Sequence, residues 1–269
     1  SAVLPRAVAL SSTATQTASI IGPALGGLIY GLGPAVPFAC AAVCFAGASL
    51  AISAMRLERA APRKEPVTLA SVFSGLHFIW DRPVVLGTIS LDLAAVLLGG
   101  ATALLPIYAR DILHTGPWGL GLLRLGPALG ALGMGIVMSV LPLNRHVGLK
   151  MFAAVTVFGL ATLVFALSKN VALSVAALVV LGAADNISVV IRSSLVQLLT
   201  PPEMLGRVAA VNSLFVGTSN QLGEFESGMT AALFGAVPAA ALGGLGTIMV
   251  VVLWMKLFPA LRRADTLAG

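Results

Sequence analysis

The sequence predicts an all-α membrane protein that crosses a lipid bilayer several times. Charged residues make up only 10% of the chain, against about 25% in soluble domains. Apolar residues reach 58% and the mean hydropathy is +1.00. A soluble fold with this composition would expose apolar patches far larger than monomers tolerate. Intrinsic disorder is excluded, because it requires low hydrophobicity and high net charge.

Eight stretches are apolar enough, and about long enough, to span a bilayer, which takes about 20 residues. The stretches are 9–31, 35–55, 84–108, 117–142, 149–168, 171–198, 208–234 and 237–258. The segment 56–83 is the one long connection. It starts with charged residues and becomes amphipathic from Thr68 to Trp80, with Phe73, His77 and Trp80 on one helical face. We expect an interfacial helix that links two bundles.

Basic residues predict the orientation of the spans. Lys and Arg gather in the connections 56–83 and 142–150 and in the last residues, 259–269, whereas the alternate connections carry only Arg110 and Lys169. Because cytoplasmic connections are enriched in Lys and Arg, we expect both ends of the chain to be cytoplasmic. The scattered basic residues suit an anionic bilayer surface and form no stripe that would bind nucleic acid.

An internal repeat predicts the domain organisation. At a shift of 201 residues, the segments 6–39 and 207–240 share 11 identities, Arg6 with Arg207 and Pro37 with Pro238 among them. Copies six helices apart in one orientation are typical of transporters built from two parallel six-helix repeats. We therefore expect residues 1–55 to be the last two helices of an N-terminal bundle whose first four helices are missing before Ser1. Residues 56–83 would be the linking connection, 84–258 a complete C-terminal six-helix bundle, and 259–269 a cytoplasmic tail.

Ionisable residues within the predicted spans are the main functional candidates, because a charge in mid-bilayer costs at least about 2.5–3.5 kcal/mol and needs a partner or a wet cavity. Four acids qualify, and two arginines are possible partners: Asp92, Asp185, Glu224 and Glu226, with Arg124 and Arg192. Desolvation favours the neutral form of a carboxyl, so such a group is suited to taking up and releasing a proton. The alternative is a structural role in locking helices together. For Asp185 and Arg192, which lie two turns apart on one helix, we expect partners on another helix, Glu224 or Glu226 among them.

The segment 208–234 is the most informative helix. At 100° per residue, Ser213, Gly217, Asn220 and Glu224 form one polar stripe, and Asn212, Ser219, Gly223, Glu226 and Thr230 form another. Only the remaining arc suits lipid: Val211, Leu214, Phe215, Leu222, Phe225 and Met229. Glu224 and Glu226 therefore point in different directions, and the sequence leaves open which of them faces a central cavity.

Four further residues are candidates for contact with a substrate: Asn220, Gln221, Ser213 and Arg124. The amides and the hydroxyl are equally suited to joining helices, and Arg124 to reaching the bilayer surface with its long side chain. The sequence contains no metal-ligand spacing, nucleophile arrangement or phosphate-binding loop of the type G-x-x-x-x-G-K-[ST]. We therefore expect neither an enzyme, nor an ATP-driven pump, nor a cofactor or a metal.

Several motifs resemble the major facilitator superfamily. Gly22, Pro23, Gly26 and Gly27, in the run Gly-Pro-Ala-Leu-Gly-Gly, resemble its antiporter signature. Residues 142–150 resemble its cytoplasmic D-R-x-G-R-K loop, with Asn144 where Asp is usual. The residues from Gly182 to Gln197, Gly206 to Val208, and Asn212 to Glu226 are similar to the enterobactin-exporter-like branch.

This resemblance implies helices five to twelve of a major facilitator fold in a bacterial inner membrane. It implies proton-driven efflux of a drug, macrolide or siderophore by alternating access, with the lipid bilayer, protons, a small-molecule substrate and the missing N-terminal helices as partners. An importer or facilitator of the same fold is the first alternative. A non-transporting membrane scaffold or receptor is the second.

Overall fold

The computed structural model describes residues 29–54, 69–140 and 145–265, together with Ala18, Gly22, Leu25 and Gly26. All regular secondary structure in these residues is helical. The α-helices are α2 (Ala35–Ala54), α3 (Leu69–Trp80), α4 (Pro83–Leu98), α5 (Leu105–Ile107), α6 (Gly116–Val140), α7 (Val147–Leu167), α8 (Val171–Leu199), α9 (Leu205–Phe234), α10 (Ala236–Leu257) and α11 (Pro259–Arg262). A 3-10 turn (Ala101–Leu104) and a π turn (Tyr108–Ile112) flank α5.

Six segments of the described residues are long and apolar enough to cross a membrane: Ala35–Ala54, Pro83–Ile112, Gly116–Met138, Val147–Leu167, Val171–Leu199 and Ala236–Leu257. Each matches a predicted span. The expected span 9–31 falls mostly outside the described residues. The expected span 208–234 lies within α9, which is 30 residues long but too polar to meet the same criterion.

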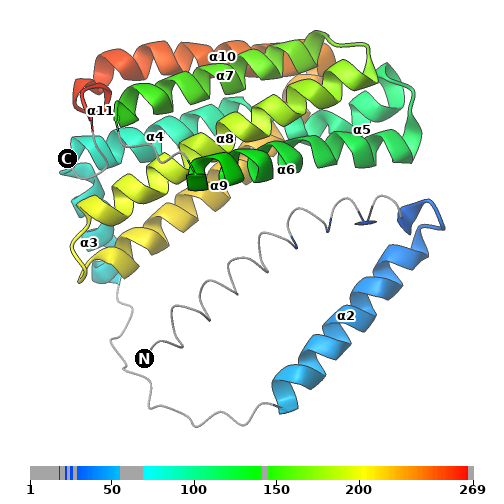
Figure 1. Ribbon diagram of the computed structural model, residues 1–269, viewed down its shortest axis with the longest axis horizontal. Coiled ribbons are helices and arrows are strands. Elements are labelled where there is room, and N and C mark those ends of the chain that lie inside the picture. Colours follow the sequence, from blue (N-terminus) through cyan, green and yellow to red (C-terminus); the bar gives the residue numbers. More distant parts are fainter. Residues whose placement is uncertain are drawn as a thin grey trace.

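The helices α4 to α10 pack as one bundle (Figure 1). Within the bundle, α6 packs on α8, α8 on α7, α7 on α10, α10 on α4, and α4 on α9. Helix α4 also contacts α8. The short helix α3 packs against α9 and α4, at the end of the bundle opposite to α5. Helix α2 has no buried residue and lies apart from the bundle in Figure 1.

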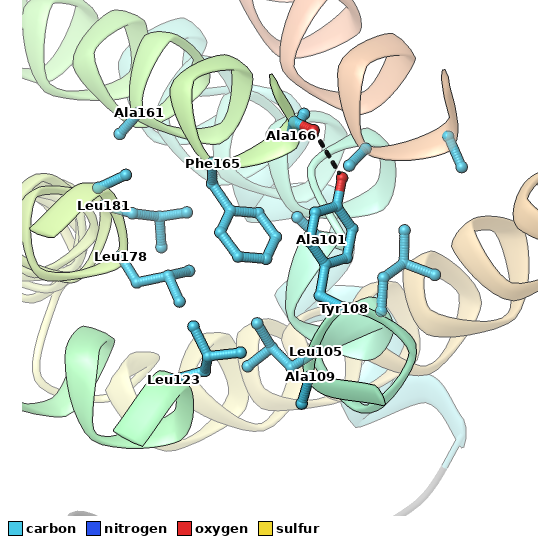
Figure 2. Close-up of a cluster of buried hydrophobic side chains, with 14 residues drawn as sticks. Ala101, Leu105, Tyr108, Ala109, Leu123, Ala161, Phe165, Ala166, Leu178 and Leu181 are labelled. Atoms are coloured by element: carbon cyan, nitrogen blue, oxygen red, sulfur yellow. Dashed lines mark hydrogen bonds between the residues drawn. The ribbon is translucent and has the colours of Figure 1, made fainter. Parts of the chain in front are cut away.

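One apolar cluster fixes the end of the bundle near α5 (Figure 2). Tyr108 is fully buried there, stacks at 4.4 Å between ring centroids on Phe165, and donates its hydroxyl hydrogen to the carbonyl oxygen of Ala166 at 3.0 Å. Leu123 of α6 and Leu178 of α8 complete the contact. A buried Tyr needs such an acceptor, so this cluster joins four segments of the bundle in a defined geometry.

Small residues allow the closest helix contacts. A Cβ atom at Gly182 of α8 would collide with the carbonyl of Pro127 in α6, and one at Gly130 with the carbonyl of Val179. The predicted span 84–108 is interrupted at Gly99 and Gly100, where α4 ends. There the backbone approaches α9 so closely that a Cβ atom at Gly100 would lie 2.7 Å from the Gly223 carbonyl oxygen. Close packing of small residues of this kind is typical of helices in membranes.

The outer surface of the bundle is apolar. Leu160 and Leu167 of α7 and Leu245 and Met249 of α10 are each about half exposed or more, at 50%, 69%, 55% and 66%. A soluble domain does not present such a surface, whereas lipid covers it without cost. The amphipathic helix predicted from Thr68 to Trp80 is present as α3, and Phe73, His77 and Trp80 are exposed on it.

The segment that follows α10 docks on the bundle. Leu261 of α11 is fully buried, and the carbonyl oxygen of Ala264 accepts a hydrogen bond from the Gly148 N–H at 3.0 Å. Asp265 accepts a hydrogen bond from the His146 N–H through its carboxylate, at 3.1 Å. These bonds satisfy N–H groups that the first turn of α7 cannot pair internally. Residues 259–265 are therefore a packed part of the bundle; 266–269 lie outside the described residues.

Candidate functional site

A buried ion pair crosses the interior of the bundle. Asp92 Oδ2 of α4 and Arg192 Nη2 of α8 lie 3.3 Å apart, and both side chains are 7% exposed. We expected Arg192 to pair with a residue of another helix, Glu224 or Glu226 among them. The partner does lie on another helix, but it is Asp92, because the direct contact of α4 with α8 brings these two side chains together.

Arg192 extends the pair to a third helix. Its Nη1 donates a hydrogen bond to Asn212 Oδ1 of α9 at 3.2 Å. Among the described side chains, Arg192 Nε and Ser188 Oγ are buried and have no hydrogen-bond partner. An unpaired buried polar atom costs about 1–3 kcal/mol. The site is thus a polar cluster whose hydrogen bonds are only partly satisfied within the protein.

Asp185 brings a second carboxylate to the same place. A cavity of about 10 Å³ lies between α4, α7 and α8, and Asp92, Asp185 and Ser188 all line it. Val155 and Phe158 of α7 form its apolar wall. The cluster therefore contains two carboxylates and one guanidinium, with one negative charge in excess when both acids are ionised.

The two glutamates of α9 have different surroundings, as predicted. Glu224 is exposed, whereas Glu226 is partly buried and accepts a hydrogen bond from Thr230 Oγ1 at 2.9 Å. The expected lipid-facing arc is partly wrong. Val211 is buried and Phe215 partly buried, since both pack with the cluster of Ile79 and Val85 from α3 and α4.

The two polar stripes of α9 differ in the same way. Ser219 and Gly223 of one stripe are buried against the bundle, and so is the neighbouring Ser227. Ser213, Gly217 and Asn220 of the other stripe are exposed, and so is the neighbouring Gln221. The exposed stripe is available to a ligand or to another part of the protein. Arg124 of α6 is also exposed.

The antiporter-like motif is described only in part. Gly22 and Gly26 are helical, and nothing lies within 4 Å of the position of a Cβ atom at either residue. Pro23 and Gly27 lie outside the described residues, as do Asn144 and the first copy of the repeat up to residue 17. At the two described glycines the structure shows no close helix contact.

The sequence did not predict that Asn212 contacts Arg192. It does place Ser188 on the same helical face as Asp185 and Arg192, but it does not show that this face meets Asp92. For Asn212 the signal is weaker: it is a polar residue on an inward stripe whose contact with Arg192 depends on how α8 and α9 cross.

Comparison with known proteins decides the family. Residues 2–224 match the family model described as Major Facilitator Superfamily. The chain belongs to this superfamily. As a superfamily member it is a multi-pass membrane protein of the transporter class and not an enzyme. No solved structure matches it significantly.

Three curated relatives of this superfamily member are named as exporters or efflux pumps. The chain is 28% identical to "Enterobactin exporter EntS" of Citrobacter koseri over 97% of its own length and 62% of the relative's. It is 30% identical to "Multidrug efflux pump Tap" of Mycolicibacterium fortuitum over 78% of its own length and 52% of the relative's. The EntS of Escherichia coli O1:K1 is 27% identical over the same shares as the first. The chain thus spans between half and two thirds of the length of these relatives.

Proposed function

We propose that the protein is a proton-coupled exporter of a small molecule, working by alternating access in a bacterial inner membrane. The observation that carries the proposal is the buried cluster of Asp92, Asp185 and Arg192. Membership of the superfamily and the names of its relatives, a siderophore exporter and a multidrug pump, support efflux of a drug, macrolide or siderophore.

The charge balance of the cluster supports proton coupling. Two carboxylates beside one guanidinium carry a net negative charge, which one bound proton neutralises. In an interior of low dielectric constant the neutral state is favoured until water enters. The cluster also links α4, α8 and α9, so a change of protonation at Asp185 or Asp92 alters the contacts that hold these helices together.

Glu224 and Glu226 remain the second pair of coupling candidates. Glu224 and the exposed residues Ser213, Asn220 and Gln221 lie on the surface of α9 that the rest of the bundle leaves uncovered. We assign this surface to the passage between the C-terminal bundle 84–258 and an N-terminal bundle to which residues 1–55 belong. In this arrangement residues 56–83 and both chain ends lie on the cytoplasmic side.

Proton-driven flux in proteoliposomes tests the proposal. With the full-length gene product and an imposed pH gradient, we expect uphill movement of a dye substrate that stops when the gradient is collapsed. Asp185→Asn should reduce the gradient-driven flux at least tenfold, and Glu224→Gln or Glu226→Gln should reduce it if either acid takes part. Asp81→Asn, which changes an exposed carboxylate at the end of α3, serves as the control and should have no effect.

Three results distinguish the alternatives. Flux that is equally fast with and without a pH gradient favours a facilitator. Accumulation of the substrate on the alkaline side of the membrane favours an importer coupled by symport. If the intact protein moves no solute under any gradient, transport is refuted and the scaffold alternative gains.

A further inference from the structure

A hollow at the α5 end of the bundle is positively charged and mostly apolar. It has a volume of about 420 Å³ and is lined by Gly26, Tyr30, Pro106, Ala109, Arg110, Gly116, Pro117, Leu120 and Arg124. This volume lies within the range of about 300–1,000 Å³ typical of small-molecule sites. The lining residues that the structure describes include two arginines and no carboxylate.

Arg124 is the central cation of this hollow. It lies eight residues after the start of α6 at Gly116, about 12 Å along the axis at the usual rise of 1.5 Å per residue. Pro117, Leu120 and Arg124 follow the i, i+3, i+7 spacing of a single helical face. None of the ion pairs among the described residues includes Arg124, which is exposed to the hollow.

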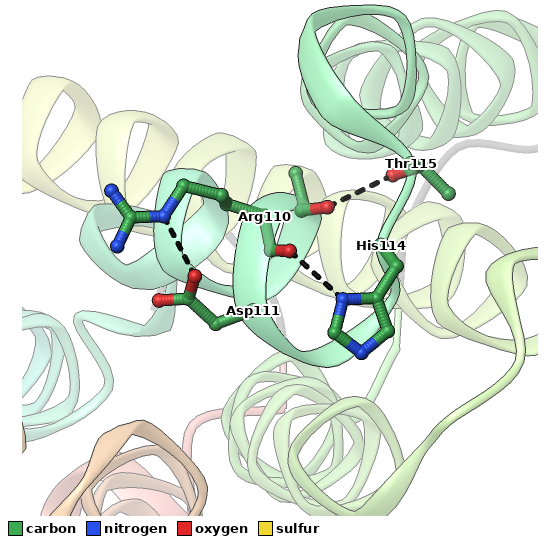
Figure 3. Close-up of polar contacts among 5 residues, drawn as sticks. Arg110, Asp111, His114 and Thr115 are labelled. Carbon is green, nitrogen blue, oxygen red and sulfur yellow. Dashed lines mark hydrogen bonds and ion pairs between the residues drawn. The ribbon is translucent and has the colours of Figure 1, made fainter.

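Arg110 also lines the hollow, and Figure 3 shows its polar contacts. Its Nε donates to Asp111 Oδ1 at 2.7 Å, and the two Nη atoms point away from that contact. The carbonyl oxygen of Arg110 lies 3.2 Å from His114 Nδ1, and Thr115 Oγ1 donates to the Ala109 carbonyl at 3.3 Å. These bonds fix the turn that leads into α6. Asp111 compensates part of the Arg110 charge, so Arg124 remains the stronger attraction.

The position of Arg124 favours an anionic partner in the hollow. An arginine within a membrane span is costly unless it meets water or an anion, and the first turn of α6 adds the partial positive charge of a helix N-terminus to the same hollow. The walls formed by Tyr30, Pro106, Pro117 and Leu120 favour an apolar body. An anionic group on an apolar or aromatic molecule fits both features.

We propose that this hollow binds the transported molecule and selects anionic, largely apolar compounds, with Arg124 as the residue that recognises the anionic group. That the bound molecule is the transported one rests on the proposed function, whereas binding of an anionic compound in the hollow does not. By the predicted orientation the hollow opens on the side of the membrane away from α3, where an exporter releases its cargo.

Binding of a charge-matched pair of probes tests the inference. The probes are dansyl-phenylalanine, which is anionic, and its neutral amide, which has nearly the same size. The full-length protein is reconstituted in nanodiscs of zwitterionic lipid, and affinities are measured by calorimetry. We expect the wild type to bind the anion about tenfold more tightly than the amide, the value for one charge-assisted hydrogen bond.

Substitutions assign the preference to Arg124. Arg124→Gln should weaken binding of the anion about tenfold and leave binding of the amide unchanged, while Arg124→Lys should retain part of the preference. Lys169→Gln is the matched control, because it removes one exposed positive charge from the α7–α8 connection, outside the residues lining the hollow. It should leave both affinities unchanged.

Several outcomes would overturn the inference. One is a wild type without preference for the anion; another is an Arg124→Gln variant, folded by its thermal transition, that loses both probes equally. A third is a Lys169→Gln variant with the same effect as Arg124→Gln. Competition by phosphatidylglycerol added to the nanodiscs would assign the site to a lipid headgroup instead. Gradient-driven transport without anion preference would refute this inference and leave the proposed function standing. Anion binding as described, without transport, would support the binding site and refute the proposed function.

Discussion

Removing the charges of Asp92 and Arg192 one at a time and together should show strong coupling. The substitutions are Asp92→Leu, Arg192→Met and the double variant, which replaces the ion pair by apolar side chains of similar length. Asp92→Leu leaves a buried guanidinium without its carboxylate, and Arg192→Met leaves a buried carboxylate without its guanidinium. The double variant leaves neither charge.

The magnitude follows from the geometry. At 3.3 Å between Oδ2 and Nη2, two unit charges attract each other by about 5 kcal/mol at an effective dielectric constant of ~20. Desolvation of the two groups offsets much of this attraction. Removing one partner of a buried pair costs about 3–5 kcal/mol, whereas replacing both is often nearly neutral. Since a lone carboxylate can take up a proton, Arg192→Met should cost less than Asp92→Leu.

Equilibrium unfolding in mixed micelles, followed by tryptophan fluorescence, measures these free energies of unfolding. With a nearly neutral double variant and the single-substitution costs above, we expect an interaction free energy of about 5 kcal/mol or more in the double-mutant cycle. The double variant should be more stable than Asp92→Leu alone. If the effects of the two single substitutions simply add, the pair is not energetically coupled and the reasoning on the cluster is refuted.

Three further predictions follow from packing and hydrogen bonds. Gly182→Ala should destabilise the bundle by about 3 kcal/mol or more, because its Cβ atom would collide with the Pro127 carbonyl; Gly217→Ala, with nothing within 4 Å, is the control and should change stability by about 0.5 kcal/mol or less. Tyr108→Phe should cost about 1 kcal/mol in the same unfolding assay through loss of the hydrogen bond to Ala166, and no change would show that this bond is not formed. Truncation after Leu257 should destabilise α7, because it removes Leu261 and the hydrogen-bond acceptors at Ala264 and Asp265. We expect faster amide hydrogen exchange at Val147 and Gly148, and unchanged exchange there would contradict the docked arrangement.

Much of the fold could be predicted from the sequence, because membrane spans are set by length and hydrophobicity. The breaks at Gly, Pro and charged residues placed α6, α7, α8 and α10 to within a few residues. The break after Leu98 was not predicted, because Gly99 and Gly100 are tolerated inside apolar spans and only their contact with Gly223 in α9 shows why the helix ends there.

The candidate site could be predicted in its members but not in its pairing. An acid or arginine inside a span is a functional candidate because a charge in the bilayer is costly in free energy. This argument identified Asp92, Asp185 and Arg192. Which side chains meet depends on how helices cross, and a single helical face cannot reveal it. The same limit explains why Val211 and Phe215 were assigned to lipid: they are apolar, but the contact of α3 and α4 with α9 covers them.

Counting protons against substrate tests the central claim most directly. Proteoliposomes containing the full-length protein and an internal pH-sensitive dye would be given substrate without an imposed gradient, and proton flux would be compared with substrate flux. The account predicts that protons move opposite to substrate in a fixed ratio, and that Asp185→Asn abolishes proton movement while substrate still binds. Substrate movement with no accompanying proton flux, or unaltered proton flux in a variant lacking both Asp92 and Asp185, would contradict it.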